Sequence, residues 1–415
     1  MTEKILLPSG LRIVLETMPH LRSVSTGLWV SAGSAYEKEQ ESGMSHFLEH
    51  LLFKGTEKRN ALQISATMEG VGGVLNAFTS REHTCYYTRS MDEHFGLSLE
   101  LLADMYLHSL LDPKEVERER NVIMEEINMY EDSPEDVAAD IFLAQLWPGH
   151  PYGRPISGTL SSVEGVSRDQ LVEYLRSVYV PRRTVLAVAG NVTAEQVREL
   201  AERLFPAEEG QALPTLPSPI SQGGAISKVK DIEQSHICMG FPGLSLDDPD
   251  YYAANVLANI LGGGASSRLF QEVREKRALS YSSYCYLDSF DKSGFLMAYS
   301  ATHPKHTREL IQVMAAQFSD IAAHGVSDEE LQRSRDQLRG TLLLSMESSS
   351  SVMSRLGRTE LALCELFNLE DRVRKLASVS HEDLARVAKR LLRPGSMVLS
   401  QVSPKPIEID TAELF

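Results

Sequence analysis

Two pairs of segments in this chain resemble each other at nearly the same spacing, and this internal repeat constrains the fold more than any other feature. Residues 46–55 (HFLEHLLFKG) align with residues 255–264 (NVLANILGGG), an offset of 209. Residues 115–120 (EVERER) align with residues 330–335 (ELQRSR), an offset of 215. Similar offsets at separate places predict a duplicated domain; the alternative is chance similarity between amphipathic helices.

The boundary between the two halves has the composition of a linker. Residues 209–224 (EGQALPTLPSPISQGG) contain three prolines and three glycines without hydrophobic periodicity. At 415 residues the chain is also longer than one hydrophobic core usually supports. We therefore predict a first domain at 1–212, a linker at 213–224 and a homologous second domain at 225–415.

Local patterns predict strands and helices in each half. Helical periodicity covers residues 43–53 and much of 94–205. Strands are expected at residues 4–16 around a Pro-Ser-Gly turn, 24–31, 85–90, 184–190 and, as the counterpart of 24–31, at 234–241.

The segment His46-Phe47-Leu48-Glu49-His50 carries the clearest chemical signal. On a helix its apolar residues form one stripe, whereas His46, Glu49 and His50 lie on the opposite side. Imidazoles at i and i+4 can reach one ion. Catalytic zinc takes three protein ligands and leaves a position for water, so Glu49 suits the general base. This order is the inverted zincin signature; the alternative is a solvated helix face.

The second copy of this segment has different residues at the same positions. Asn255, Ala258 and Asn259 replace the two histidines and the glutamate. If the repeat is real, only the first half can hold the metal.

The third ligand is expected on a helix formed by residues 115–130. Glu119 and Glu126 are seven residues apart and flank its apolar face, whereas Glu117 and Glu125 point toward solvent. A ligand must point inward, so we predict Glu126. Glu119 suits a hydrogen-bond partner for a ligating histidine. The alternative, that these glutamates are merely solvated, is weaker for the flanking pair.

Taken together, these residues resemble the pitrilysin/insulinase superfamily of inverted zinc peptidases, and especially its mitochondrial processing peptidase branch with bacterial single-chain relatives. The matching blocks are GSAYE (33–37), FLEHLLFKGT (47–56), NAFTSREHT (76–84), ERNVIMEEI (119–127), AGN (189–191) and SRLFQEVREKRALSYS (267–282). The resemblance implies a clamshell of two homologous α+β halves, each an antiparallel-rich sheet packed with helices. It implies one zinc per chain held by His46, His50 and Glu126. Glu49 would be the general base of an endopeptidase.

The resemblance also implies roles that residue patterns alone would not assign. Glu119 would be an auxiliary carboxylate of the catalytic site. Arg274 and Tyr281 would lie near the scissile bond. Residues 74–79 match a substrate-binding edge strand that pairs with extended peptides, the alternative being an ordinary internal strand. The substrate-binding residues would be Asn76, Ala77, Phe78 and Thr79.

An acidic stretch at residues 130–140 follows the predicted third ligand. Such a stretch is usually a solvated loop and helix start. However, Asp136 and Asp140 are four residues apart, share a helix face and could grip a guanidinium. Their spacing after Glu126 resembles that of acidic residues that bind an arginine upstream of the cut in processing peptidases. We therefore expect a preference for a basic residue near the cut.

Charge and composition limit the classes of molecule that the chain is expected to bind and the compartment in which it is expected to work. The net charge is −16, from 41 Lys and Arg against 57 Asp and Glu, which disfavours nucleic acid and favours basic peptides. The four cysteines form no CxxC pair and are expected to be reduced. No signal-peptide pattern and no apolar run of about 18 residues is present, so we expect no membrane insertion and a cytoplasmic location.

Two other functions and one assembly follow from the same resemblance. Complex III core proteins are non-catalytic scaffolds with degraded metal motifs, which the intact motif here argues against. A peptide-binding, chaperone-like clamshell is the second alternative. Gly262-Gly263-Gly264 is a short counterpart of the longer glycine-rich loop in a non-catalytic processing-peptidase subunit, and no P-loop sequence follows it. One chain could serve both roles in a homodimer.

Overall fold

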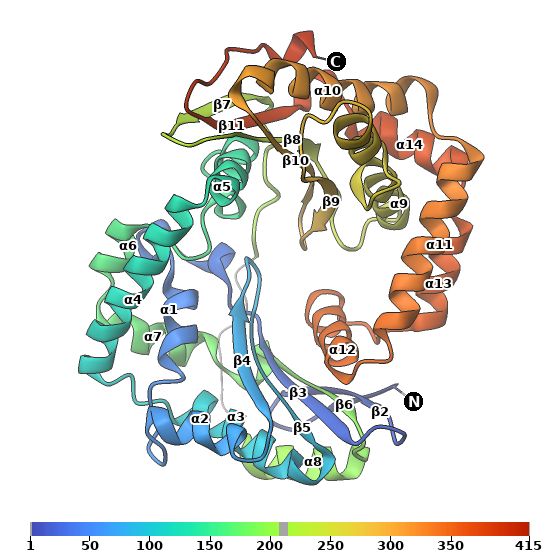
Figure 1. The fold of residues 1–415 in the computed structure, drawn as a ribbon. Coiled ribbons are helices and arrows are strands. Elements are labelled where there is room, and N and C mark those ends of the chain that lie inside the picture. The colour runs from blue at the N-terminus through green and yellow to red at the C-terminus, as the bar shows by residue number, and fades with distance from the viewer. Residues whose placement is uncertain (1, 207–214, 415) are drawn as a thin grey trace. The chain divides into compact units, whose positions relative to one another are not determined.

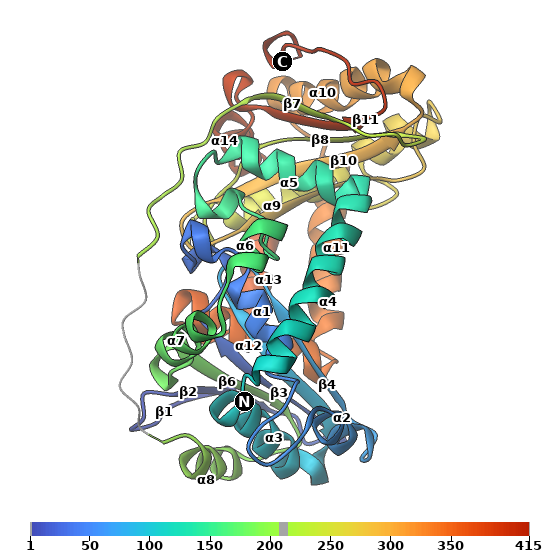
Figure 2. The same cartoon turned by 90° about the vertical axis from the view of Figure 1, so that its left-hand side faces the viewer.

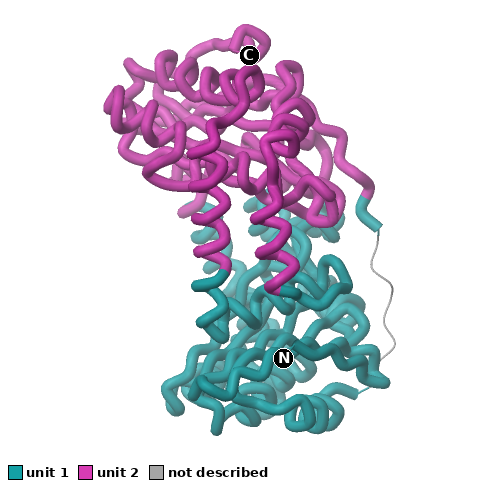
Figure 3. Tube along the Cα trace, turned by 90° about the vertical axis from the view of Figure 1, so that its right-hand side faces the viewer, with its two compact units in different colours: residues 1–128, 155–216, 343–368 teal, residues 129–154, 217–342, 369–415 magenta. Residues whose placement is uncertain are grey.

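The computed structural model describes residues 2–206 and 215–414, which form two compact units (Figure 3). Unit 1 consists of Met1–Asn128, Pro155–Leu216 and Leu343–Asn368, and unit 2 of Met129–Arg154, Pro217–Leu342 and Leu369–Phe415. These units differ from the sequential division expected above, because 129–154 and 343–368 each join the unit built mainly from the other half of the chain. In the expected linker, residues 213 and 214 lie outside the described residues, and 215–223 have no regular structure.

Unit 1 is built around a six-stranded sheet with the order β1-β2-β6-β3-β5-β4. The strands are β1 Thr2–Leu6, β2 Arg12–Thr17, β3 Ser23–Val30, β4 Val74–Thr79, β5 Thr84–Met91 and β6 Thr184–Gly190. β2 and β6 pair in parallel and the other neighbours pair antiparallel. β4 is therefore an edge strand, hydrogen-bonded along one side to β5.

Helices cover both faces of this sheet (Figure 1). The helices are α1 Met44–Leu51, α2 Ala61–Glu69, α3 Phe95–His108, α4 Pro113–Asp132, α6 Leu160–Gly165, α7 Arg168–Val178, α8 Ala194–Leu204 and α12 Ser349–Leu363. The even-numbered β3 residues Val24 and Leu28 join the main core with α1 and α3. The odd-numbered Trp29 faces α12, where its indole donates a hydrogen bond to the Met353 sulfur at 3.4 Å. Alternation along the strand thus gives each face its own set of packing residues.

Gly357 explains how closely α12 approaches the sheet. A Cβ at this position would collide with the indole ring of Trp29. α12 comes from the second half of the chain but packs on β3 and β6 of unit 1. In the same way, α5 (Pro134–Leu146) comes from the first half but packs on β8 (Ser235–Pro242) and β11 (Val398–Ser403) of unit 2 (Figure 1). The two halves of the chain have exchanged a helix.

Unit 2 repeats the architecture of unit 1. Its sheet has the order β7-β11-β8-β10-β9, with β7 and β11 parallel and the other neighbours antiparallel, as in the β2-β6-β3-β5-β4 part of unit 1. The strands are β7 Gly224–Val229, β8 Ser235–Pro242, β9 Ser283–Ser289, β10 Gly294–Thr302 and β11 Val398–Ser403. The other helices are α9 Tyr251–Gly262, α10 Thr307–His324, α11 Asp328–Ser345, α13 Leu369–Ser378 and α14 His381–Leu391, with a π-helical segment at Phe270–Glu275. The shared strand order supports the duplication inferred from the repeat.

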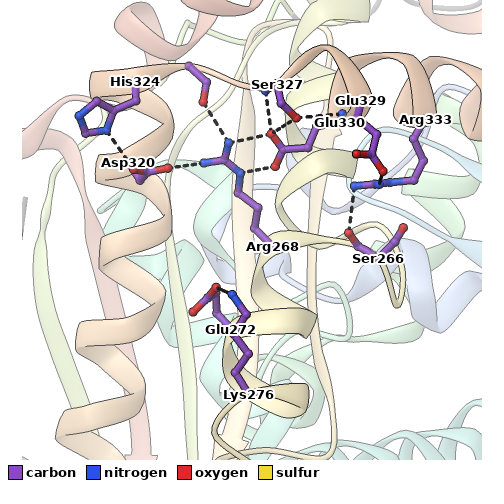
Figure 4. A network of polar contacts seen from close by, with 11 residues as sticks. Ser266, Arg268, Glu272, Lys276, Asp320, His324, Ser327, Glu329, Glu330 and Arg333 are labelled. Atoms are coloured by element: carbon purple, nitrogen blue, oxygen red, sulfur yellow. Dashed lines mark hydrogen bonds and ion pairs between the residues drawn. The ribbon is translucent and has the colours of Figure 1, made fainter.

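A network of ion pairs around Arg268 anchors the start of the π-helical region (Figure 4). The guanidinium donates to both carboxylate oxygens of Glu330 at 2.6 and 2.9 Å, to Asp320 at 2.6 Å and to the Gly325 carbonyl at 3.0 Å. Such bidentate pairs fix geometry as well as adding energy. The segment that leads to Arg274 is thereby tied to α10 and α11.

Candidate metal centre

A buried carboxylate holds the start of the motif helix α1. Glu37 accepts hydrogen bonds from the backbone amides of Gly43 and Ser45, both at 2.7 Å. Gly43 has a φ of 95°, which glycine adopts readily, and the chain turns into the helix at this residue. The negative charge of Glu37 at this end of α1 complements the helix dipole. The apolar stripe of α1 is buried as predicted, at Met44, Phe47, Leu48 and Leu51. Packing and capping together fix which side of α1 carries the histidines.

The structure brings the three predicted ligands together within unit 1. α4 lies beside α1 (Figure 2). Glu126 Oε2 lies 3.6 Å from His46 Nε2 and 3.4 Å from His50 Nε2. One ligand atom from each of the three residues lies within 4.8 Å of the others. Two imidazole nitrogens and one carboxylate oxygen are a donor set found in catalytic zinc sites, so these residues fit a zinc ion.

Glu119 contacts the other nitrogen of His50. Its Oε2 lies 3.2 Å from His50 Nδ1, and its Oε1 forms an ion pair with Lys54 Nζ at 2.7 Å. A carboxylate on Nδ1 orients the ring and leaves Nε2 for a metal. Nδ1 of His46, in contrast, is buried and has no hydrogen-bond partner among the described residues. Glu119 is the partner that the sequence predicts for a ligating histidine, and Lys54 is a further neighbour that no sequence pattern indicates.

The two histidines have opposite pKa shifts. Burial and the neighbouring His50 lower the pKa of His46 to about 4. Burial also lowers the pKa of His50, but hydrogen bonds to Glu119 and Glu126 outweigh it and raise the pKa to about 9. Metal binding at His50 would be coupled to proton release, because a ligating imidazole must be neutral.

Glu49 projects from the same side of α1 as the histidines and is half-buried. Burial raises its pKa, an effect reduced by a hydrogen bond from Thr79 and the charge of His50. Thr79 Oγ1 donates to Glu49 Oε2 at 2.6 Å. A carboxyl group with a raised pKa, next to side chains that could hold a metal ion, is suited to accept and release protons. No sequence pattern indicates the hydrogen bond from Thr79 to Glu49, because the two residues are 30 positions apart on different elements.

The predicted substrate-binding residues lie on the edge strand β4, which alternates between exposed and half-buried side chains. Val74, Asn76 and Phe78 are the exposed residues of the strand. Phe78 packs edge-on against Trp29 at 5.5 Å between ring centroids. Thr79 is on the opposite face, toward α1.

The remaining predicted residues belong to unit 2. Arg274 and Tyr281 contact each other: the guanidinium carbon lies 4.4 Å from the tyrosine ring centroid, and Arg274 Nη1 donates to the Tyr281 carbonyl at 3.4 Å. Tyr281 is 83% exposed. Asp136 is exposed and Asp140 half-buried on α5.

Comparison with known proteins agrees with this fold. Residues 12–160 match the family described as Insulinase (Peptidase family M16), and residues 165–338 match the Peptidase M16 inactive domain. The uncharacterized zinc protease YmxG of Bacillus subtilis (strain 168) is 38% identical over 405 residues, covering 97% of this chain and 98% of the relative. An uncharacterized zinc protease of Mycobacterium leprae (strain TN) is 41% identical over 409 residues, covering 96% of this chain and 92% of the relative.

Solved structures share the fold. A protease from Helicobacter pylori superposes with a TM-score of 0.93 at 23% identity, covering 97% of this chain and 99% of the other. A peptidase M16 inactive domain from Pseudomonas fluorescens gives a TM-score of 0.90 at 20% identity, covering 99% of each chain.

Two α+β units with this family match define a zinc metallopeptidase, whose substrates are peptides. The chain belongs to the insulinase family of peptidases, M16. The family, the two α+β units and the zinc cofactor expected from the sequence are thereby confirmed. Among the described residues, none of the helices combines the length and apolar character needed to cross a membrane.

Proposed function

We propose that this chain is an endopeptidase whose zinc ion is held by His46, His50 and Glu126, with Glu49 as the general base. The observation that carries the proposal is the convergence of three ligand atoms within 4.8 Å. Glu49 lies next to His50 on the same helix and is not needed as a ligand. Glu119 serves as the carboxylate that orients His50, through its 3.2 Å contact with Nδ1.

The chain's own residues supply binding and proton transfer. Zinc, when bound, polarises the scissile carbonyl and lowers the pKa of water. Glu49 accepts a proton from the attacking water and delivers it to the leaving amine. The free edge of β4 offers main-chain hydrogen bonds to an extended peptide, through the stretch Asn76, Ala77, Phe78 and Thr79. Such pairing accepts varied sequences, because its hydrogen bonds go to the main chain of the peptide.

Unit 2 contributes substrate contacts in this proposal. Arg274 and Tyr281 contact the peptide near the scissile bond, and their mutual contact gives them a defined arrangement. Asp136 and Asp140 select a basic residue on the N-terminal side of the cut, because two carboxylates on one helix face can bind a guanidinium. A homodimer and a cytoplasmic location remain predictions; analytical ultracentrifugation tests the first.

A quenched peptide with an internal cleavage site tests the proposed activity. We expect turnover that a chelator abolishes and added zinc restores, with products that identify an internal cut. A purified chain that contains zinc but shows no chelator-sensitive turnover across a peptide library would instead support the scaffold or peptide-binding alternatives.

Paired peptides with Arg or Ala upstream of the cut test the specificity. We expect a higher kcat/KM for the Arg peptide, and a smaller preference in Asp140→Ala. Asp169→Ala is the matched control, because it removes one highly exposed carboxylate of unit 1. An equal loss of preference in both variants would mean that net charge, and not a pocket, causes the selectivity.

A further inference from the structure

The alternation of β4 separates two kinds of side chain in the proposed substrate-binding strand. Leu75 and Ala77 pack against the main core of unit 1. Thr79 has the same parity and therefore faces α1, whereas Asn76 and Phe78 face the other side. The Thr79 hydroxyl is consequently directed at the motif helix and away from the face that carries Phe78.

Neighbouring groups hold the Thr79 hydroxyl in place. Its proton is donated to Glu49 Oε2 at 2.6 Å. On the next strand, Thr84 Oγ1 lies 3.2 Å from Thr79 Oγ1 and donates its own proton to the Ala32 carbonyl at 2.8 Å. Thr84 is fully buried. The two hydroxyls thus form a short polar chain behind the carboxylate, anchored in the sheet.

Glu49 depends on this contact for its orientation. A glutamate has several rotatable bonds, and fixing them costs conformational entropy. Among the described residues, Thr79 is the hydrogen-bond donor that reaches its carboxylate. Proton transfer requires the base to be held close to one productive geometry, so a fixed donor here influences the rate.

We propose that Thr79 is a positioning residue that orients the general base, so that the edge strand which receives the peptide also holds Glu49. This inference rests on the proposed function, because it takes Glu49 as the base. It changes the expected role of Thr79: its main chain belongs to the substrate-binding edge, but its side chain acts on Glu49. Substrate pairing and base orientation thereby share one residue.

Kinetics of Thr79→Val test the proposal, because valine keeps the shape of threonine and removes the hydroxyl. We expect kcat to fall roughly tenfold, the effect of losing a hydrogen bond to a charged group, with KM and zinc content unchanged. Thr79→Ser restores the hydroxyl and should restore most of kcat. In a Glu49→Gln background, Thr79→Val should cause no further loss. If Thr79→Val does not fold, Thr79→Ala provides the same comparison.

Thr88→Val is the matched control. Thr88 lies on β5 opposite Leu75, is buried, and its hydroxyl has no hydrogen-bond partner among the described residues. The same substitution there should leave kcat unchanged. Crystal structures of zinc-loaded wild type and Thr79→Val give a readout independent of activity, in which the Glu49 carboxylate should leave its wild-type position in the variant.

Each outcome separates this inference from the proposed function. An unchanged kcat, a rise in KM alone, or an unmoved Glu49 carboxylate in Thr79→Val would overturn the positioning role. Absence of chelator-sensitive activity in the wild type would overturn the proposed function, and the Glu49 position in the two crystal structures would still decide whether Thr79 orients that side chain.

Discussion

The helix pair α1 and α4 in unit 1 and the pair α9 and α11 in unit 2 occupy equivalent places beside sheets of the same strand order. In unit 1, His50 Nδ1 meets Glu119 at 3.2 Å. In unit 2, Asn259 stands at the position of His50, and its Nδ2 donates to Ser334 Oγ at 2.9 Å. Ser334 follows Glu119 by 215 residues, the offset of the helix repeat. The polar contact between the helices is present in both copies, but the second is neutral.

At the other two motif positions, unit 2 also has uncharged residues in place of His46 and Glu49. Asn255, at the position of His46, donates to the Tyr251 carbonyl one turn earlier at 2.8 Å. Ala258, at the position of Glu49, is 4% exposed. Neutral amides satisfied by nearby groups cost little to bury, whereas charged groups need partners. Both copies therefore have a polar contact between these helices, whereas among the described residues the His-Glu cluster that could hold a metal lies in unit 1, in agreement with the match of residues 165–338 to an inactive domain.

Replacing His50 of unit 1 with asparagine, the residue at the equivalent position of unit 2, should have the largest effect. We expect His50→Asn to lose most of its zinc and essentially all peptidase activity, because an amide is a poor zinc ligand compared with imidazole or carboxylate. Metal analysis and peptide turnover measure this. His20→Asn, at an exposed position, is the control and should keep both. Full zinc occupancy in His50→Asn would contradict the ligand assignment.

Glu49→Gln should separate chemistry from metal binding. Glutamine keeps the shape of the side chain but cannot accept the proton, so we expect kcat to fall roughly 10²- to 10⁴-fold. Zinc content should stay at one per chain, as measured by metal analysis. Turnover close to that of the wild type would remove Glu49 from the role of base.

Glu119→Gln makes the contact with His50 in unit 1 neutral on the side of α4, as the contact between Asn259 and Ser334 is in unit 2. We expect the zinc affinity to fall roughly 10- to 100-fold, the usual cost of losing a carboxylate behind a ligating histidine. Competition with a chelator of known affinity measures it. Glu117→Gln on the same helix is the control, since that side chain is exposed and pairs with Arg120. An equal effect of both substitutions would point to general electrostatics.

Restoring histidines to the second copy should have the smallest effect. We expect Asn255→His combined with Asn259→His to keep one zinc per chain, because Thr341 follows Glu126 by 215 residues and supplies no carboxylate. Metal analysis measures the stoichiometry. A second equivalent of zinc would show that two histidines are enough to bind zinc in unit 2. The two units would then differ less in their capacity for zinc than their sequences indicate.

Much of this organisation could be predicted from local sequence patterns. The strands at 24–31 and 184–190 and the motif helix were expected within a residue or two of β3, β6 and α1. The helical wheel put Glu119 and Glu126 on one face of α4, because spacing alone decides which residues share a helix face. In the structure this face meets His46 and His50 of α1. Their roles in zinc binding remain predictions.

The parts that were missed depend on contacts between distant segments. Amphipathic spacing shows that α5 and α12 each bury a face, but it does not show which sheet covers that face. Glu37 lies six residues before Gly43 and caps α1 through a loop whose path no periodicity predicts. The hydroxyl of Thr79 reaches Glu49 across 30 residues of chain, for the same reason.

The exchange of α5 and α12 has a consequence for the order in which this protein can be completed during synthesis. β6, the last strand of the first sheet, ends at Gly190, but α12, which covers Trp29, ends at Leu363. At roughly 5–20 residues per second the ribosome takes about 10–35 s to travel between these points. During that interval the face of the sheet that carries Trp29 has no α12 to cover it, so the nascent chain presents an apolar surface of the kind that chaperones bind. Unit 1 is therefore finished only after synthesis has passed Leu363 in a chain of 415 residues.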